Sequence, residues 1–216
     1  MKSVTRFHFS SSLRWVSEAR PGLRERKKEA TVEKLRQVAL ELFTERGFDA
    51  VSVDDVAEAA DVSKTTVYRY FPSKEDLLLG RALEQLASVR EAFAERPAEE
   101  SPVEAARHAL RPVVEAHAAD PRQKRALSAL VRSTPSLAAG SQANQAAWEE
   151  MLREEIARRR PAADPFEIHL LAAELLACVR AATNYWLTDG ADRDLAELVD
   201  EAMRRLEART PASLSA

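Results

Sequence analysis

Residues 43–74 have the sequence FTERGFDAVSVDDVAEAADVSKTTVYRYFPSK, in which a polar turn separates two short amphipathic segments. The helical spacing of valine and alanine in the first segment predicts a helix over about residues 53–60. The second segment predicts a helix over about residues 64–70. The result is a pair of short helices joined by a tight turn, an arrangement that presents one helix to a partner.

Hydroxyl and carboxylate side chains stand where each of these helices begins. Ser52 or Asp54 caps the first helix and Ser63 caps the second, because such side chains accept hydrogen bonds from the unpaired N–H groups of a helix start. Asp61 lies in the turn, where the backbone can require a positive φ. Aspartate tolerates that conformation better than most residues do, so the turn is expected to form at small cost.

The second helix concentrates hydrogen-bond donors on its outer face. Val67 and Phe71 turn inward, which leaves the polar and phenolic side chains outside. These outer residues are Lys64, Thr65, Thr66, Tyr68 and Arg69. Donors beside the positive end of a helix suit the phosphate backbone of nucleic acid. A solvated surface explains any one of these residues, but the concentration of hydroxyls, phenols and cations favours DNA binding.

The segment from about Thr31 to Leu78 resembles the DNA-binding domain of the TetR family of transcriptional regulators. The resemblance rests on the elements Leu-Phe…Gly-Phe, Val-Ala, Val-Ser, Tyr-Arg-Tyr-Phe and Lys-Glu-Asp-Leu. It implies phosphate contacts from Ser63, Thr66, Tyr68, Tyr70 and Lys74, and contacts to base edges from Lys64, Thr65 and Arg69. Asp61 departs from the family, which usually has glycine in this turn, and its charge is expected to lower DNA affinity slightly.

The same resemblance implies a mode of action. We expect a homodimer that binds double-stranded, pseudo-palindromic operator DNA and acts as a repressor until a small molecule releases it. Two alternatives stay open: an activator in place of a repressor, and an architectural protein that binds DNA without sequence specificity. An enzyme is not expected, because the sequence has no phosphate-binding glycine loop, nucleophile elbow or paired metal motif.

The composition predicts an all-α fold, since alanine, leucine, glutamate and arginine dominate and only 5 glycines are present. Apolar periodicity and helix start signals along the chain predict about nine helices. The first helix is expected over about residues 28–46, with Gly47 as its stop. A long helix over about residues 74–96 begins at Lys74 and links two domains. The expected organisation is a basic extension over residues 1–27, a helix-turn-helix domain over 28–74, and a helical bundle over 75–210, for which the family resemblance implies ligand binding and dimerisation.

The positive charge of the chain is concentrated near its start. Residues 1–28 contain eight Lys/Arg and two Glu, a net charge of +6, while the whole chain carries −3. The remainder therefore carries −9. We expect the extension to be mostly disordered, and it is either an arm that contacts DNA or a start-site extension.

Several classes of protein are excluded by what the sequence lacks. Cys178 is the single cysteine, so neither an internal disulfide nor a thiolate metal cluster is expected. His108, His117 and His169 lack metal-ligand spacing, and we expect no cofactor and no metal. No apolar run reaches the roughly 18 residues of a membrane span, so a cytoplasmic protein without a membrane partner is expected.

Two helices near the C-terminus are candidates for the dimer interface. A helix over about residues 164–188 is apolar on several sides, and one over about residues 193–208 has a single apolar stripe. The stripe consists of Leu195, Leu198, Val199, Ala202, Met203 and Leu206. We favour a four-helix interface between two copies over packing within one chain, because a helix-turn-helix needs two spaced half-sites.

Apolar residues of the middle helices predict a ligand pocket. The candidates are Leu110, Val114, His117, Leu130, Val131, Trp148, Leu152, His169 and Trp186. Their character predicts an apolar or amphipathic effector. The stretch from Arg132 to Leu137, followed by Trp148, also resembles members of the family that respond to acyl-coenzyme A or belong to the mycofactocin type.

Overall fold

The computed structural model describes residues 22–188 and 192–210, and the regular secondary structure of this part of the chain is all α-helix, with nine α-helices as expected. The helices are α1 (Leu23–Arg46), α2 (Val53–Ala59), α3 (Lys64–Tyr70), α4 (Asp76–Ala94), α5 (Pro102–Ala119), α6 (Pro121–Ser133), α7 (Pro135–Arg159), α8 (Pro165–Thr188) and α9 (Leu195–Glu207).

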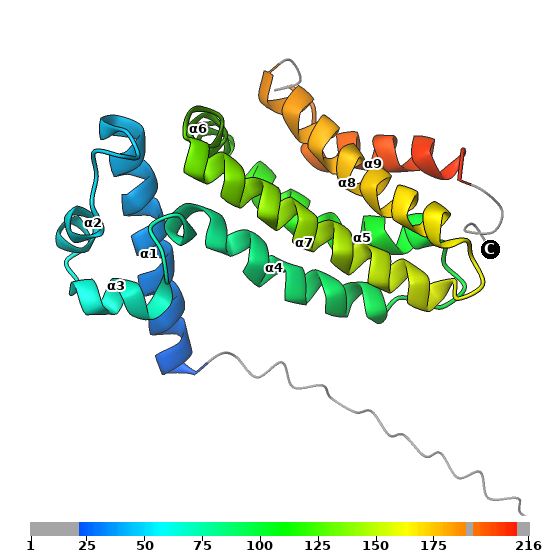
Figure 1. The fold of residues 1–216 in the computed structure, drawn as a ribbon, viewed down its shortest axis with the longest axis horizontal. Helices are drawn as coiled ribbons and strands as arrows, with labels where there is room; N and C mark the ends of the chain where they lie inside the picture. The colour runs from blue at the N-terminus through cyan, green and yellow to red at the C-terminus, as the bar shows by residue number, and fades with distance from the viewer. Residues whose placement is uncertain (1–21, 189–191, 211–216) are drawn as a thin grey trace, which may run out of the picture.

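The helices form two parts (Figure 1). α1–α3, which we call the N-terminal unit, lie together at one end, and α4 leads from them into a bundle formed by α4–α9. Within the bundle α5 packs against α9, α4 packs against α7, and α8 contacts both α7 and α9. Among the described helices, none is long and apolar enough to cross a membrane.

Side-chain caps account for several of the helix starts. Ser52, and not Asp54, caps α2: its hydroxyl accepts from the Asp55 N–H at 3.1 Å, and the Asp55 carboxylate accepts from the Ser52 N–H at 2.7 Å. Ser101 and Asp120 cap α5 and α6, each directly before a proline in the first turn. These reciprocal and single caps satisfy N–H groups that the helix itself leaves unpaired.

The starts of α1 and α4 differ from the sequence prediction. α1 begins at Leu23 rather than near residue 28, with Gly22 as its N-cap, because residues 23–30 are mostly good helix formers that continue the helix. The last part of the expected extension is therefore helical, while residues 1–21 lie outside the described residues. α4 begins at Asp76, since Ser73 and Asp76 exchange hydrogen bonds of 2.9 and 3.2 Å that hold Lys74 in the preceding turn.

Two hydrophobic cores lie in the described part of the chain. The larger one fills the bundle. The smaller one is the core of the N-terminal unit, but it also contains Leu77 and Leu78 of α4, Leu130 of α6 and Leu137 of α7. The N-terminal unit therefore packs on the bundle through shared apolar side chains, and its core extends past the domain boundary expected at residue 74.

Candidate DNA-binding surface and ligand cavity

The turn between α2 and α3 has the backbone conformation that the sequence suggested. Asp61 has φ of 55°, the one positive φ at a non-glycine position among the described residues. The N–H of Asp61 donates to the Glu58 carbonyl at 3.0 Å, and that of Val62 donates to the Ala57 carbonyl at 3.0 Å. These bonds close α2 and direct the chain into α3, which fixes the angle between the two helices.

α3 is anchored on one side and open on the other. Val67 and Phe71 are buried in the core of the N-terminal unit, and the Ser63 hydroxyl caps the helix by accepting from the Thr66 N–H at 3.1 Å. Seven of the eight predicted DNA contacts lie on α3 or its cap. Ser63, Lys64, Thr65, Tyr68 and Arg69 are exposed, and Thr66 and Tyr70 are half-buried. The arrangement is a single polar surface on one helix.

Two cations on this surface have partners within the unit. Lys64 forms an exposed ion pair with Asp54 at 2.8 Å, and the hydrogen bond that its ammonium donates to that carboxylate raises the pKa of Lys64. The Arg69 guanidinium donates to the Tyr70 hydroxyl at 3.0 Å and lies 4.7 Å from the centre of the Tyr70 ring. Tyr70 therefore orients Arg69, whereas sequence reasoning treated the two as independent contacts.

Lys74, the eighth predicted DNA contact, lies in a different environment. Its ammonium donates to the Phe48 carbonyl and lies 4.3 Å from the centre of the Phe48 ring and 5.4 Å from that of Phe43. The side chain is half-buried. Its visible partners are thus inside the N-terminal unit, and a phosphate contact remains a prediction.

A cavity of about 560 Å³ lies where the N-terminal unit meets the bundle. Its lining residues come from α1, α4, α5, α6, α7 and α8. Four of the predicted pocket residues are among them: Leu110, His117, Val131 and Trp148. These four side chains, which lie between residues 110 and 148 of the sequence, are brought to one site by three helices.

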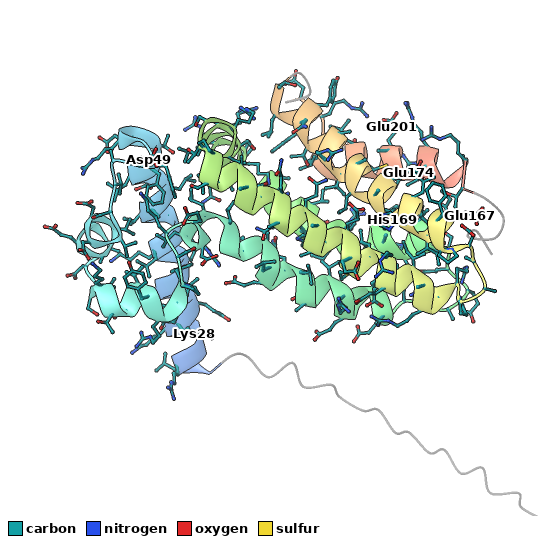
Figure 2. All side chains as sticks on the ribbon, in the orientation of Figure 1. Lys28, Asp49, Glu167, His169, Glu174 and Glu201 are labelled. Carbon is teal, nitrogen blue, oxygen red and sulfur yellow. The ribbon has the colours of Figure 1, made fainter. Side chains whose placement is uncertain are left out.

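The other five predicted pocket residues do not line this cavity. Val114, Leu152 and Trp186 fill the core of the bundle, and Leu130 belongs to the core of the N-terminal unit. His169 is exposed near the start of α8, at the end of the bundle far from α1 (Figure 2), with its Nε2 3.6 Å from Glu149 Oε1. Helical spacing marks buried faces, but it does not distinguish a filled core from a cavity wall.

Sequence reasoning missed the cations of the cavity wall. Lys124, Arg36, Arg81, Arg132 and Arg180 all line it. A signal for Lys124 was present, because it lies three and seven residues before Leu127 and Val131, on the apolar face of α6. A lysine on such a face is either paired or functional.

Lys124 and His117 contact each other, and both are electrostatically perturbed. Lys124 Nζ lies 3.3 Å from His117 Nε2. Burial lowers the pKa of Lys124 from 10.5 to about 8. Burial, followed by the positive charges of Lys124 and Arg81, lowers the pKa of His117 from 6.5 to about 3. At neutral pH the imidazole is therefore neutral while the ammonium keeps most of its charge.

The cavity wall is joined directly to the N-terminal unit. Glu33, Arg36 and Leu40 of α1 line the cavity. Arg36 pairs with Glu84 of α4 at 2.7 Å, and Arg81 of α4 pairs with Glu33. A molecule in the cavity would thus lie against the helix that carries the helix-turn-helix.

The surface available for dimerisation is smaller than expected. The apolar stripe of α9 packs inside the subunit against α5 and α8, so the proposal that it forms an interface between copies is wrong for these side chains. The buried members are Leu195, Leu198, Val199, Met203 and Leu206. α8 keeps an exposed apolar face, on which Phe166 is 73%, Leu170 48% and Tyr185 45% exposed.

Comparison with known proteins agrees with both parts of the structure. Residues 35–80 match the family described as bacterial regulatory proteins, tetR family, and residues 100–211 match the MftR C-terminal domain. The transcriptional regulator TcmR of Streptomyces glaucescens is 34% identical over 190 residues, which cover 82% of each chain. MftR of Mycobacterium tuberculosis, which carries the name of a mycofactocin biosynthesis regulator, is 30% identical over 76% of this chain and 83% of its own.

A solved relative has the same fold. FadR of Thermus thermophilus, a TetR-family repressor in complex with lauroyl-CoA, superposes with a TM-score of 0.55 and 25% identity, over 81% of this chain and 92% of its own. The helix-turn-helix, the helical bundle and these similarities agree. The chain belongs to the TetR family of DNA-binding transcriptional regulators and has a C-terminal domain of the MftR type.

Proposed function

We propose that this protein is a repressor that binds a pseudo-palindromic operator as a homodimer and leaves it when an amphipathic small molecule fills the cavity. The observation that carries the proposal is the position of the cavity: its wall includes α1, the longest helix of the N-terminal unit. A ligand in the cavity would therefore contact α1, which belongs to the same unit as the DNA-binding helix α3.

The exposed surface of α3 supports the DNA-binding part of the proposal. Ser63, Thr66, Tyr68 and Tyr70 supply hydroxyl groups that suit phosphate oxygens. Lys64, Thr65 and Arg69 are the proposed contacts to base edges, and an arginine held in one orientation suits the two acceptors of guanine. Lys74 completes the surface indirectly, by fixing the turn that follows α3.

The exposed face of α8 supports the dimer. A helix-turn-helix reads its operator with two copies whose recognition helices are about one DNA turn apart. Phe166, Leu170 and Tyr185 are exposed on α8 in the single subunit, where large apolar side chains are unfavourable. Two α8 helices related by a two-fold axis would cover one another's apolar face.

Transmission of the signal is proposed to run through α1 and α6. Lys124, Leu127 and Val131 of α6 line the cavity, while Leu130 of the same helix packs in the core of the N-terminal unit. A ligand that displaces α6 or α4 therefore changes the position of α1. For release, the ligand must bind the free form more tightly than the DNA-bound form. The lauroyl-CoA held by the relative from Thermus thermophilus supports an amphipathic ligand.

Selection on randomised duplex DNA tests the proposal. We expect one inverted repeat to be enriched, and Arg69→Ala to change the preferred base at one position of each half-site. Arg122→Ala, at an exposed arginine of α6, is the matched control and should leave the preference unchanged. Equal binding to all sequences would identify an architectural DNA-binding protein, and transcription in vitro from the enriched site distinguishes a repressor from an activator.

A further inference from the structure

We propose that the cavity recognises an anion: the acidic group of an amphipathic ligand binds Lys124, and its apolar body lies against Leu127, Val131 and Trp148. The inference rests on the proposed function, because it assigns the charge of the ligand for the same cavity. The sequence predicted only that the ligand is apolar or amphipathic, which leaves its charge open.

The first observation is the isolation of the Lys124 ammonium. Its one hydrogen-bond partner among the described residues is His117 Nε2 at 3.3 Å, and no described carboxylate lies within ion-pair distance of it. Burial alone lowers the pKa of Lys124, with no contribution from a neighbouring acid. A charge held away from bulk water without a counter-ion is unfavourable, so an anion that reaches it gains more there than at the surface.

The hydrogen-bonding roles of Lys124 and His117 exclude a ligand group that can only donate hydrogen bonds. An ammonium donates and never accepts, so His117 Nε2 accepts and the ring hydrogen lies on Nδ1. The Nδ1 atom is buried and has no partner in the described part of the chain. His117 therefore cannot neutralise Lys124, and the remaining N–H bonds of the ammonium need an acceptor. Carboxylate, sulfonate and phenolate oxygens are the strongest acceptors available to it.

The net charge of the cavity lining also favours an anionic ligand. Five Lys/Arg side chains line the cavity, against the two acidic residues Glu33 and Asp120. Glu33 pairs with Arg81, and Arg36 pairs with Glu84, so part of this charge is already neutralised. The lining as a whole keeps an excess of positive charge, which attracts anions and repels cationic compounds.

The size and the walls of the cavity select an organic anion. A volume of about 560 Å³ is far larger than an inorganic ion needs and lies in the range of small-molecule sites. Leu110, Leu127, Val131 and Trp148 supply apolar and aromatic surface. The ligand class is therefore an acid with a sizeable aliphatic or aromatic body.

The test compares two dyes with the same aromatic body. Anilinonaphthalene sulfonate carries one negative charge, and phenylnaphthylamine is its neutral parent. Each is titrated into the full-length protein at neutral pH, and binding is followed by dye fluorescence and by the intrinsic tryptophan fluorescence of the protein. We expect the sulfonate to bind at least about tenfold more tightly, the gain typical of a charge-assisted hydrogen bond away from water.

Variants locate the effect at Lys124. Lys124→Met should reduce the affinity for the sulfonate by at least about tenfold and leave that for phenylnaphthylamine within about twofold. Lys124→Arg keeps the charge and should keep the preference. Lys34→Met, the same exchange at an exposed lysine of α1, is the control and should change neither affinity. Circular dichroism of every variant verifies that the helices are intact.

The outcomes separate this inference from the proposed function. Three outcomes would overturn anion recognition. They are the lack of saturable sulfonate binding, equal affinity for both dyes, and a sulfonate affinity that is unchanged in Lys124→Met. Sulfonate binding that depends on Lys124 but fails to release operator DNA supports anion recognition and contradicts ligand-controlled release. Release by neutral compounds alone, without a role for Lys124, leaves the proposed function standing and overturns the inference.

Discussion

The ammonium of Lys74 lies 4.3 Å from the centre of the Phe48 ring and donates a hydrogen bond to the carbonyl of the same residue. Phe48 directly follows Gly47, the C-cap of α1, and Lys74 precedes α4, so this contact joins two points 26 residues apart. The path from α3 into the bundle is thereby fixed against α1. A lysine in a DNA-binding segment can thus act inside the fold rather than on the phosphate backbone.

Replacement of Lys74 tests that role. Lys74→Met removes the cation–π contacts with Phe43 and Phe48 and leaves the Phe48 carbonyl unpaired, so the free energy of unfolding should fall by about 1–3 kcal/mol. Lys64→Met removes only an exposed ion pair with Asp54, and its cost should stay below about 1 kcal/mol. Thermal denaturation followed by circular dichroism measures both. Equal stability of Lys74→Met and the wild type would contradict this structural role, and the predicted phosphate contact would then be the remaining role of Lys74.

Two substitutions of Asp61 test the conformation of the turn and the effect of its charge separately. A β-branched side chain at φ of 55° is strained, so Asp61→Val should destabilise the protein by about 1–2 kcal/mol. Asp61→Asn tolerates the same φ and removes one negative charge next to α3. It should leave stability within about 0.5 kcal/mol and raise operator affinity at low salt. Operator binding is measured over a range of salt concentrations, because the effect of the charge depends on salt and the effect of backbone strain does not. An unaltered operator affinity for Asp61→Asn would show that the carboxylate is too far from DNA to affect binding.

The hydrogen bond between Arg69 and Tyr70 predicts an indirect effect on sequence preference. Tyr70→Phe keeps the ring under the guanidinium but removes the oxygen that accepts from Arg69 at 3.0 Å. Arg69 then has more freedom, and discrimination at its base should weaken by a few-fold while stability changes little. Arg122→Ala, at an exposed arginine of α6, is the control. An unchanged preference would mean that Arg69 does not contact a base or needs no orientation.

A charge on the exposed face of α8 should prevent dimerisation. Leu170→Asp places a carboxylate in the proposed interface, and the dimer dissociation constant should rise by about a hundredfold or more, because burying an unpaired charge is costly. Leu83→Asp is closely matched, since Leu83 on α4 is 50% exposed and Leu170 is 48% exposed. Sedimentation velocity at micromolar concentration compares the two. If Leu170→Asp remains dimeric and Leu83→Asp dissociates, the interface lies on α4.

The low pKa of His117 makes a prediction about acid stability. Below pH 6.5 the unfolded chain binds a proton at this histidine, whereas the folded protein does not until about pH 3. The folded state therefore loses stability as pH falls through this window, by about 2 kcal/mol between pH 6.5 and 5. His117→Gln should remove this part of the pH dependence, and His108→Gln, at an exposed histidine of the same helix, should not. Urea denaturation at several pH values measures the slopes, and parallel curves for the wild type and His117→Gln would disprove the assignment.

The helix-turn-helix was predictable from sequence because its signals are local. Ser63 caps α3, and the predicted bounds of 64–70 agree with the structure. Asp61 shows the positive φ that the turn suggested. The start of α1 was not predicted, because the positive charge of residues 1–28 favoured a basic extension up to residue 27, whereas Gly22 is the N-cap of α1.

The cavity could be predicted only in part, because it depends on how six helices meet. Leu110, His117, Val131 and Trp148 were found because apolar or aromatic character marks buried positions. Trp186 satisfies the same criterion and fills the core instead. No rule of helical spacing states which buried faces leave space between them, since that depends on side-chain volumes contributed by several distant segments.

The presence of Glu33, Arg36 and Leu40 in the cavity wall limits how the protein can be recombined. A hybrid regulator that joins residues 75–210 to the helix-turn-helix of another protein would replace one wall of the effector site along with the operator specificity. Such a chimera would respond to the original effector only if its new first helix restored those three side chains. An engineered regulator should therefore keep the α1 of this protein and change only α2 and α3. New sequence specificity can be introduced by substitutions on the outer face of α3.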